Sequence, residues 1–224
     1  MTRVHDWQAA RTELNKTKLL LLDFDGPVCS VFSGLLASEV AIRLRNHLYG
    51  LVSGPLVGLD KTSSDPFDVL SYAVTHTPEH VAAIEFQFTQ QECKAVQSAQ
   101  PTAGAHALIK EWSRDGRPLA IVSNNSVDAI RLYLDIHDLT HAVSLISART
   151  PQVVDKLKPA PYLINMAVSG LNIDPKDAAF IGDSLSDLVA GTSAGVTRIA
   201  FANKAWKRAA LGSTCDILIE KFGR

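Results

Sequence analysis

The chain has 224 residues, 46% of them hydrophobic and 20% charged, with a formal net charge of -1, which is the composition of a globular protein. This near-neutral charge lacks the basic excess of a nucleic-acid-binding domain, and no apolar run is long enough to span a bilayer. The three cysteines lack a metal-binding spacing and residues 1–18 lack the apolar centre of a signal peptide, so we expect a cytoplasmic protein with reduced thiols.

Short apolar runs that stop abruptly at polar residues recur along the chain. The first three cover residues 19–22, 118–122 and 178–181, and further candidates are residues 141–147, 197–202 and 215–219. Continuous apolar runs of this length are typical of strands that are buried on both faces of a parallel sheet.

Segments with the apolar spacing of helices lie between these runs. They cover residues 9–14, 104–114, 126–134, 162–168 and 187–194. Ser126 is a suitable N-cap, and Gly116 and Gly195 can each end a helix. Because strands alternate with helices, we predict an α/β fold with a Rossmann-like parallel sheet core and helices on both faces.

Residues 30–100 break this alternation. They contain helical stretches at 36–48 and 80–99 around a middle rich in Gly, Pro and Ser at 50–66. We predict a helical domain inserted after the first strand, which we call the cap. The core would then consist of residues 1–29 and 101–224, and the cap would cover the carboxyl ends of the strands.

Polar residues follow the apolar runs directly. Asp23 and Asp25 follow the first, Ser123 and Asn124 the second, and Asp183 the third. Ligands of open α/β sheets bind beyond the carboxyl ends of the strands, so these side chains should meet at one rim. Close carboxylates repel one another unless a cation compensates them, and Mg²⁺ prefers such oxygen ligands. We therefore predict Mg²⁺ as the cofactor, bound by Asp23, Asp183 and a backbone carbonyl at Asp25.

An ionised Asp beside a metal can attack phosphorus and form an aspartyl-phosphate. Asp23 is the candidate nucleophile, and Asp25 could protonate the leaving group and then activate water. Ser123 and the backbone at Asn124 could hold the phosphate, and Lys158 could balance its charge. Lys156, two residues earlier, competes with Lys158, although the following Pro159 favours Lys158.

Four ordered motifs resemble those of the haloacid-dehalogenase-like hydrolase superfamily, in its branch with phosphoglycolate phosphatase and β-phosphoglucomutase. The motifs are Asp23-Phe24-Asp25-Gly26, Ser123-Asn124, Lys158-Pro159, and Gly182-Asp183-Ser184-Leu185-Ser186-Asp187. The resemblance implies that Asp23 is the nucleophile and Asp25 the acid and base. It also implies that Ser123, Lys158 and Gly26 contact the phosphate, and that Asp183 and Asp187 serve the metal. We expect Asp187 to orient the site rather than to bind the metal directly.

The sequence thus predicts a phosphatase that acts on a small phosphate ester, with no nucleic-acid or membrane partner. A sugar phosphomutase shares the core motifs, and a family member that binds phosphate ligands without turnover is a further alternative. Asp25 argues against a dehalogenase, which does not need a second Asp in the first motif. No pattern in the cap indicates one substrate, and none indicates an oligomeric state.

Overall fold

The run of four leucines forms β1 (Leu19–Leu22) at the centre of the sheet in the computed structural model, which describes residues 7–223. Within those residues the main sheet has six strands in the order β5-β4-β1-β6-β7-β8, and every neighbouring pair is parallel. The other strands are β4 (Leu119–Ser126), β5 (Leu145–Arg149), β6 (Ala178–Gly182), β7 (Thr197–Phe201) and β8 (Ile217–Ile219).

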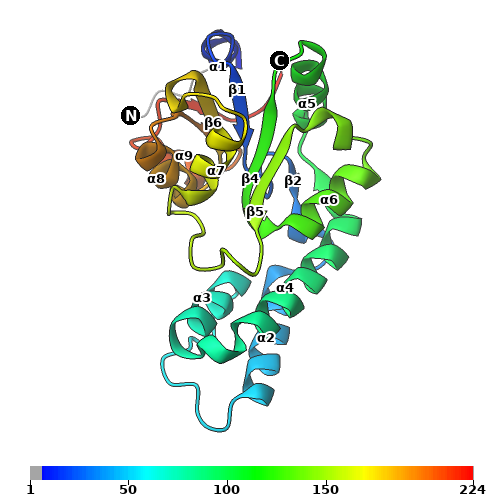
Figure 1. Cartoon of the computed structure of the whole chain (residues 1–224), viewed down its shortest axis with the longest axis vertical. Helices are drawn as coiled ribbons and strands as arrows, with labels where there is room; N and C mark the ends of the chain where they lie inside the picture. The colour runs from blue at the N-terminus through cyan, green and yellow to red at the C-terminus, as the bar shows by residue number, and fades with distance from the viewer. Residues whose placement is uncertain (1–6, 224) are drawn as a thin grey trace.

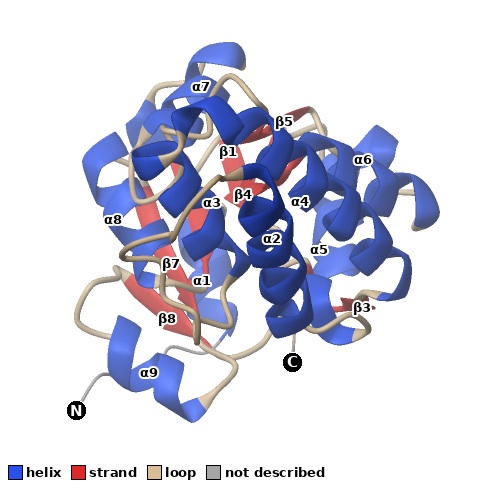
Figure 2. Ribbon diagram, turned by 90° about the horizontal axis from the view of Figure 1, so that it is seen from below, coloured by secondary structure: helices blue, strands red, loops and turns tan. Residues whose placement is uncertain are grey.

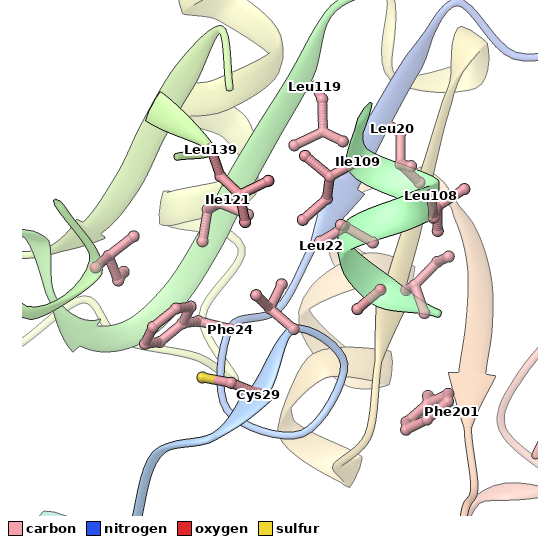
Figure 3. Close-up of a cluster of buried hydrophobic side chains, with 14 of the residues drawn as sticks. Leu20, Leu22, Phe24, Cys29, Leu108, Ile109, Leu119, Ile121, Leu139 and Phe201 are labelled. Carbon is pink, nitrogen blue, oxygen red and sulfur yellow. The ribbon is translucent and has the colours of Figure 1, made fainter. Parts of the chain in front are cut away.

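Alternate leucines of β1 enter two separate cores because successive side chains of a strand point to opposite faces. Leu20 and Leu22 pack with α1 (Trp7–Leu14), α5 (Ala105–Arg114) and α6 (Val127–Ile136). Figure 3 shows this side, with Leu20 and Leu22 near Ile109 of α5. Leu19 and Leu21 pack against α7 (Tyr162–Gly170) and α8 (Leu185–Ala194) on the opposite face. A helix layer on each face of a parallel sheet confirms the predicted fold class.

The cap forms three helices beyond the carboxyl end of the sheet (Figures 1 and 2). They are α2 (Ala37–Leu51), α3 (Pro66–His76) and α4 (Val81–Ala95), and they bury a hydrophobic cluster of their own. Where the chain enters and leaves this segment, β2 (Cys29–Ser30) and β3 (Gln100–Pro101) pair in antiparallel fashion. The division into core and cap at residues 30 and 100 remains our prediction.

Helix α3 was not predicted, although its start carries a recognisable pattern. The Asp65 side chain accepts a hydrogen bond from the Phe67 backbone N–H at 2.8 Å, and Pro66 occupies the first turn. Both features are typical of a helix N-terminus. The predicted irregular middle of the cap, residues 50–66, ends where α3 begins, and we assigned no element to residues 67–79 from the sequence.

A second difference concerns β4, which we predicted to end before Ser123. The strand continues to Ser126, with a shift in its register against β5 between Ser123 and Ser126. Such a bulge inserts extra residues and re-aims side chains at the end of a strand.

Helix α9 (Ala205–Leu211), also not predicted, packs Leu211 near β7 and β8. No helix among residues 7–223 has both the length and the apolar character to cross a membrane.

We predict that Leu21→Ala lowers the free energy of unfolding by about 2–5 kcal/mol, because it leaves a cavity where a fully buried side chain packs against α7 and α8. Val57→Ala is the control, since Val57 is 75% exposed, and it should change the value by about 0.5 kcal/mol or less. Urea denaturation measures both. Equal effects of the two substitutions would contradict the assignment of β1 to the centre of the core.

Candidate active site

Three neighbouring strands bring the predicted site residues to one rim. Asp23 follows β1, Ser123 lies in β4 on one side of it, and Asp183 follows β6 on the other side. All three line one cavity of about 490 Å³, together with Asp25 and Lys158. The cap closes the opposite wall with Phe32, Ala37, Ser64, Asp65, Pro66 and Phe67.

Lys158 lies between two carboxylates. Its Nζ is 2.8 Å from Asp23 Oδ1 and 2.5 Å from Asp187 Oδ1, and it also donates to the Val122 carbonyl at 3.2 Å. Burial lowers the pKa of Lys158, but the charges of Asp187 and Asp23 more than offset that effect, so its pKa is raised. Lys158 is therefore a fixed positive charge beside Asp23. The competing Lys156 instead places its Nζ 5.0 Å from the ring centre of Tyr162.

The side chain of Asn124 holds the Lys158 segment in place. Its Nδ2 donates to the Lys158 carbonyl at 3.0 Å, and its Oδ1 accepts from the Lys158 backbone N–H at 2.8 Å. This pairing uses both ends of the amide. The side chain of Asn124 thus joins β4 to the loop that carries Lys158, a role that we did not predict.

The carboxylates of the rim are buried close to one another, which raises their pKa values. The pKa of Asp23 is raised to about 7, mainly by burial and then by the charge of Asp187, while Lys158 partly offsets the increase. Burial raises the pKa of Asp183 to about 6, against the opposing charge of Lys207. Asp25 remains partly exposed, yet desolvation raises its pKa to about 6, even though its Oδ1 accepts the Val31 backbone N–H at 2.9 Å. The rim therefore lacks enough positive charge to keep all of its carboxylates ionised near neutral pH.

Asp23, Asp183 and Asp187 offer oxygen atoms that lie within 4.8 Å of one another. Asp187 is already occupied, because Oδ1 contacts Lys158 and Oδ2 accepts from Ser184 Oγ at 2.6 Å and from the Ser184 backbone N–H at 3.0 Å. The bond from the Ser184 N–H, together with a bond from the Asp187 backbone N–H to Ser184 Oγ at 3.3 Å, forms the capping box at the start of α8. Hard carboxylate oxygens fit a divalent cation such as Mg²⁺. Asp23 and Asp183 each engage a lysine through one oxygen, Oδ1 with Lys158 and Oδ2 with Lys207 respectively, so each has a second oxygen to offer to a cation.

Gly26 and Lys207 both contact Asp183. Gly26 has a φ of 112°, and a Cβ at this position would lie 1.9 Å from Asp183 Oδ2, so only glycine allows this approach. The ammonium of Lys207, from α9, forms an ion pair with the same carboxylate. Sequence reasoning missed Lys207, since it lies in an ordinary-looking helix beyond the last motif.

A family model described as haloacid dehalogenase-like hydrolase matches residues 58–201, more than half of the chain. The chain belongs to the haloacid dehalogenase-like hydrolase family. This confirms the resemblance and identifies the protein as a hydrolase of that family. Because the matched residues begin after the first motif, the role of Asp23 rests on the geometry of the rim.

Solved structures share the fold at low sequence identity. CbbY from Rhodobacter sphaeroides in complex with phosphate is 20% identical with a TM-score of 0.67, over 92% of this chain and 95% of that one. A predicted phosphatase from Clostridium acetobutylicum is 17% identical with a TM-score of 0.68, over 92% of this chain and 94% of that one. A predicted phosphoglycolate phosphatase from Haemophilus somnus is 17% identical with a TM-score of 0.64, over 92% and 95% of the two chains.

One curated relative is the bifunctional riboflavin kinase/FMN phosphatase of Arabidopsis thaliana. It is 29% identical over 127 residues, which make up 54% of this chain. The match covers 33% of that protein, so the chain corresponds to about a third of its length.

We predict that Gly26→Ala destabilises the protein more than Gly116→Ala does. Both glycines have positive φ, so each substitution carries a backbone cost of about 1–2 kcal/mol. Only the methyl group at position 26 meets another residue, Asp183, since nothing lies within 4 Å of a Cβ at position 116. Urea denaturation of the two variants measures the difference. Equal destabilisation would contradict the close approach of Gly26 to Asp183.

Proposed function

We propose that the protein is a magnesium-dependent phosphatase that hydrolyses a small phosphomonoester through an aspartyl-phosphate on Asp23. The observation that carries this proposal is the pairing of the buried Asp23 carboxylate with Lys158 at 2.8 Å, in a cavity that also contains Ser123, Asp25 and Asp183. The cavity thus offers a nucleophile, a fixed cation, a hydroxyl donor and two further carboxylates. These groups are the ones that phosphoryl transfer through an enzyme carboxylate requires.

Asp23 and Asp183, with the carbonyl oxygen of Asp25, would hold Mg²⁺, which neutralises charge on the phosphate and on the carboxylates. We propose that Asp187 does not bind the metal, because Lys158 and Ser184 occupy its oxygens. Instead it orients Lys158 and caps α8. Gly26 keeps the backbone close to Asp183 and, in our proposal, close to the phosphate as well.

In the first chemical step, Asp23 attacks phosphorus while Ser123, the backbone at Asn124 and Lys158 hold the phosphoryl oxygens. Asp25 gives its proton to the leaving oxygen as the ester bond breaks, which needs a protonated carboxyl group. The raised pKa of Asp25, about 6, keeps part of this group protonated in weakly acidic to neutral solution. In the second step Asp25 takes a proton from the water that attacks the phosphorus of aspartyl-phosphate, and Asp23 leaves as a carboxylate with release of inorganic phosphate.

The substrate in this proposal is small, since the cavity of about 490 Å³ is closed on one side by the cap. Two similar proteins, a bifunctional riboflavin kinase/FMN phosphatase and a predicted phosphoglycolate phosphatase, support a phosphomonoester. We propose a cytoplasmic enzyme that needs neither a nucleic acid nor a membrane. Formation of an isomerised product in the presence of a bisphosphate would instead identify a sugar phosphomutase, and metal binding without turnover would identify a binding protein.

We predict that Asp23→Asn lowers kcat by on the order of 10³-fold or more, because the amide is not a nucleophile. The measurement is phosphate release from an aryl phosphate in the presence of Mg²⁺. Asp177→Asn is the matched control, since Asp177 forms a surface ion pair with Lys18 and should leave turnover unchanged. Turnover by Asp23→Asn at the rate of the unmodified protein would rule out the mechanism.

We predict that Mg²⁺ raises the melting temperature and that Asp183→Asn removes this effect. A cation that binds only the folded state stabilises it by about 2.7 kcal/mol at 100 times its Kd, which corresponds to several degrees. Thermal unfolding with Mg²⁺ and with a chelator makes the comparison. Asp174→Asn serves as the control because Asp174 lies on the surface. A melting temperature that does not respond to millimolar Mg²⁺ would contradict the assignment of the metal site.

A further inference from the structure

A completely buried arginine joins the cap to the core. Arg149 ends β5, and its Nη2 lies 2.6 Å from Glu92 Oε2 while its Nε lies 3.3 Å from Glu85 Oε1. Both glutamates belong to α4, and the side chains of Arg149 and Glu92 have no exposed surface. The guanidinium also lies 4.2 Å from the ring centre of Phe88 in the same helix. Buried charges are costly unless they are paired and hydrogen-bonded, so the remaining donors and acceptors of this ion pair also need partners.

Glu92 also binds the end of β4, next to the predicted phosphate-binding residues. Its Oε1 accepts from Asn125 Nδ2 at 2.8 Å, and its Oε2 accepts from the Ser126 backbone N–H at 3.0 Å. Arg149 contributes from the other side, since its Nη1 donates to the Asn124 carbonyl at 2.8 Å. The ion pair therefore fixes the bulged segment of β4 at three successive residues.

Asn125 extends this network to Ser123. An ionised carboxylate only accepts hydrogen bonds, so Glu92 must face the NH₂ group of the Asn125 amide. The amide oxygen then points to Ser123, whose Oγ donates to it at 3.1 Å. Ser123 Oγ also accepts from the Asn125 backbone N–H at 3.3 Å. The Ser123 hydroxyl is thus held by a chain of contacts that begins at Arg149 and Glu92. When the hydroxyl donates its single proton to a phosphoryl oxygen instead of Asn125 Oδ1, the bond from the Asn125 backbone N–H still holds Oγ in place.

We propose that Glu92 and Arg149 are positioning residues for phosphate binding, acting through Asn125 on Ser123. Neither of them lines the cavity that holds Asp23, so they do not contact the substrate themselves. The inference rests on the proposed function, in which Ser123 holds a phosphoryl oxygen. It makes α4 of the cap, which supplies Glu92, part of the phosphate-binding machinery, and Asn125, which lines the cavity, connects the two.

Glu92→Gln and Glu85→Gln form a matched pair that tests this role. Both variants remove one charge from α4 beside Arg149, but only Glu92 contacts the end of β4. We expect Glu92→Gln to weaken binding of inorganic phosphate, measured by calorimetry with Mg²⁺, by about 10- to 100-fold, since small displacements of positioned groups have effects of this size. Glu85→Gln should stay within about twofold of the unmodified protein. Equal phosphate affinities of the two variants would overturn the proposal.

Asn125→Ala separates positioning from stability. It removes the side-chain bonds of Asn125 to Ser123 and to Glu92, keeps the backbone N–H bond to Ser123, and leaves the ion pair between Glu92 and Arg149 in place. We expect a folded protein, checked by its melting temperature, with phosphate affinity reduced by about tenfold or more. Unchanged phosphate affinity in folded Asn125→Ala would overturn the proposal even if Glu92→Gln does not fold.

Phosphate binding and turnover distinguish this inference from the proposed function. If the unmodified protein binds phosphate but releases none from an aryl phosphate, the catalytic proposal fails and the positioning role is still tested by affinity. A protein that does not bind phosphate at all would overturn both.

Discussion

Lys158 lies between the buried carboxylates of Asp23 and Asp187, and the arrangement of the site depends on this interaction. The carboxyl ends of the parallel strands meet at one rim of the sheet, so the acidic side chains that follow them lie close together in a poorly solvated site. One lysine compensates part of that charge and fixes the position of Asp23. The remaining excess of negative charge, visible in the raised pKa values of Asp23, Asp25 and Asp183, favours a divalent cation.

Much of this could be predicted because local sequence specifies it. The apolar runs at 19–22, 118–122 and 178–181 form buried strands, and the polar residue after such a strand lies at the rim, so the positions of Asp23 and Asp183 follow from the pattern alone. The run at 141–147 predicts its strand less well, because β5 covers Leu145–Arg149. The bulge that carries Ser123, Asn124 and Asn125 within β4 depends on pairing with β5 and leaves no such pattern. The same holds for Lys207 and Arg149. Their partners lie on other elements, and a single buried charge in a sequence does not indicate which carboxylate will neutralise it.

The cap and the core contact each other at more places than the two points where the chain passes from one to the other. The cap supplies one wall of the cavity through Phe32 and Phe67, and its helix α4 supplies Glu92 to the end of β4. Phe67 packs against Phe88 of α4, with ring centres 4.9 Å apart, so α4 contacts both the cavity wall and the end of β4. We therefore expect substitutions on the buried side of α4 to change the affinity for phosphate. We expect substitutions on the cavity wall to change which leaving group the enzyme accepts.

The central claim is that Asp23 becomes phosphorylated during turnover. The most direct measurement is to stop the reaction with acid after a few milliseconds, reduce with borohydride, which converts an aspartyl-phosphate to homoserine, and map the peptides by mass spectrometry. The account predicts homoserine at position 23 only when substrate and Mg²⁺ are both present. Unmodified aspartate at position 23 during rapid turnover, or homoserine at another position, would contradict it.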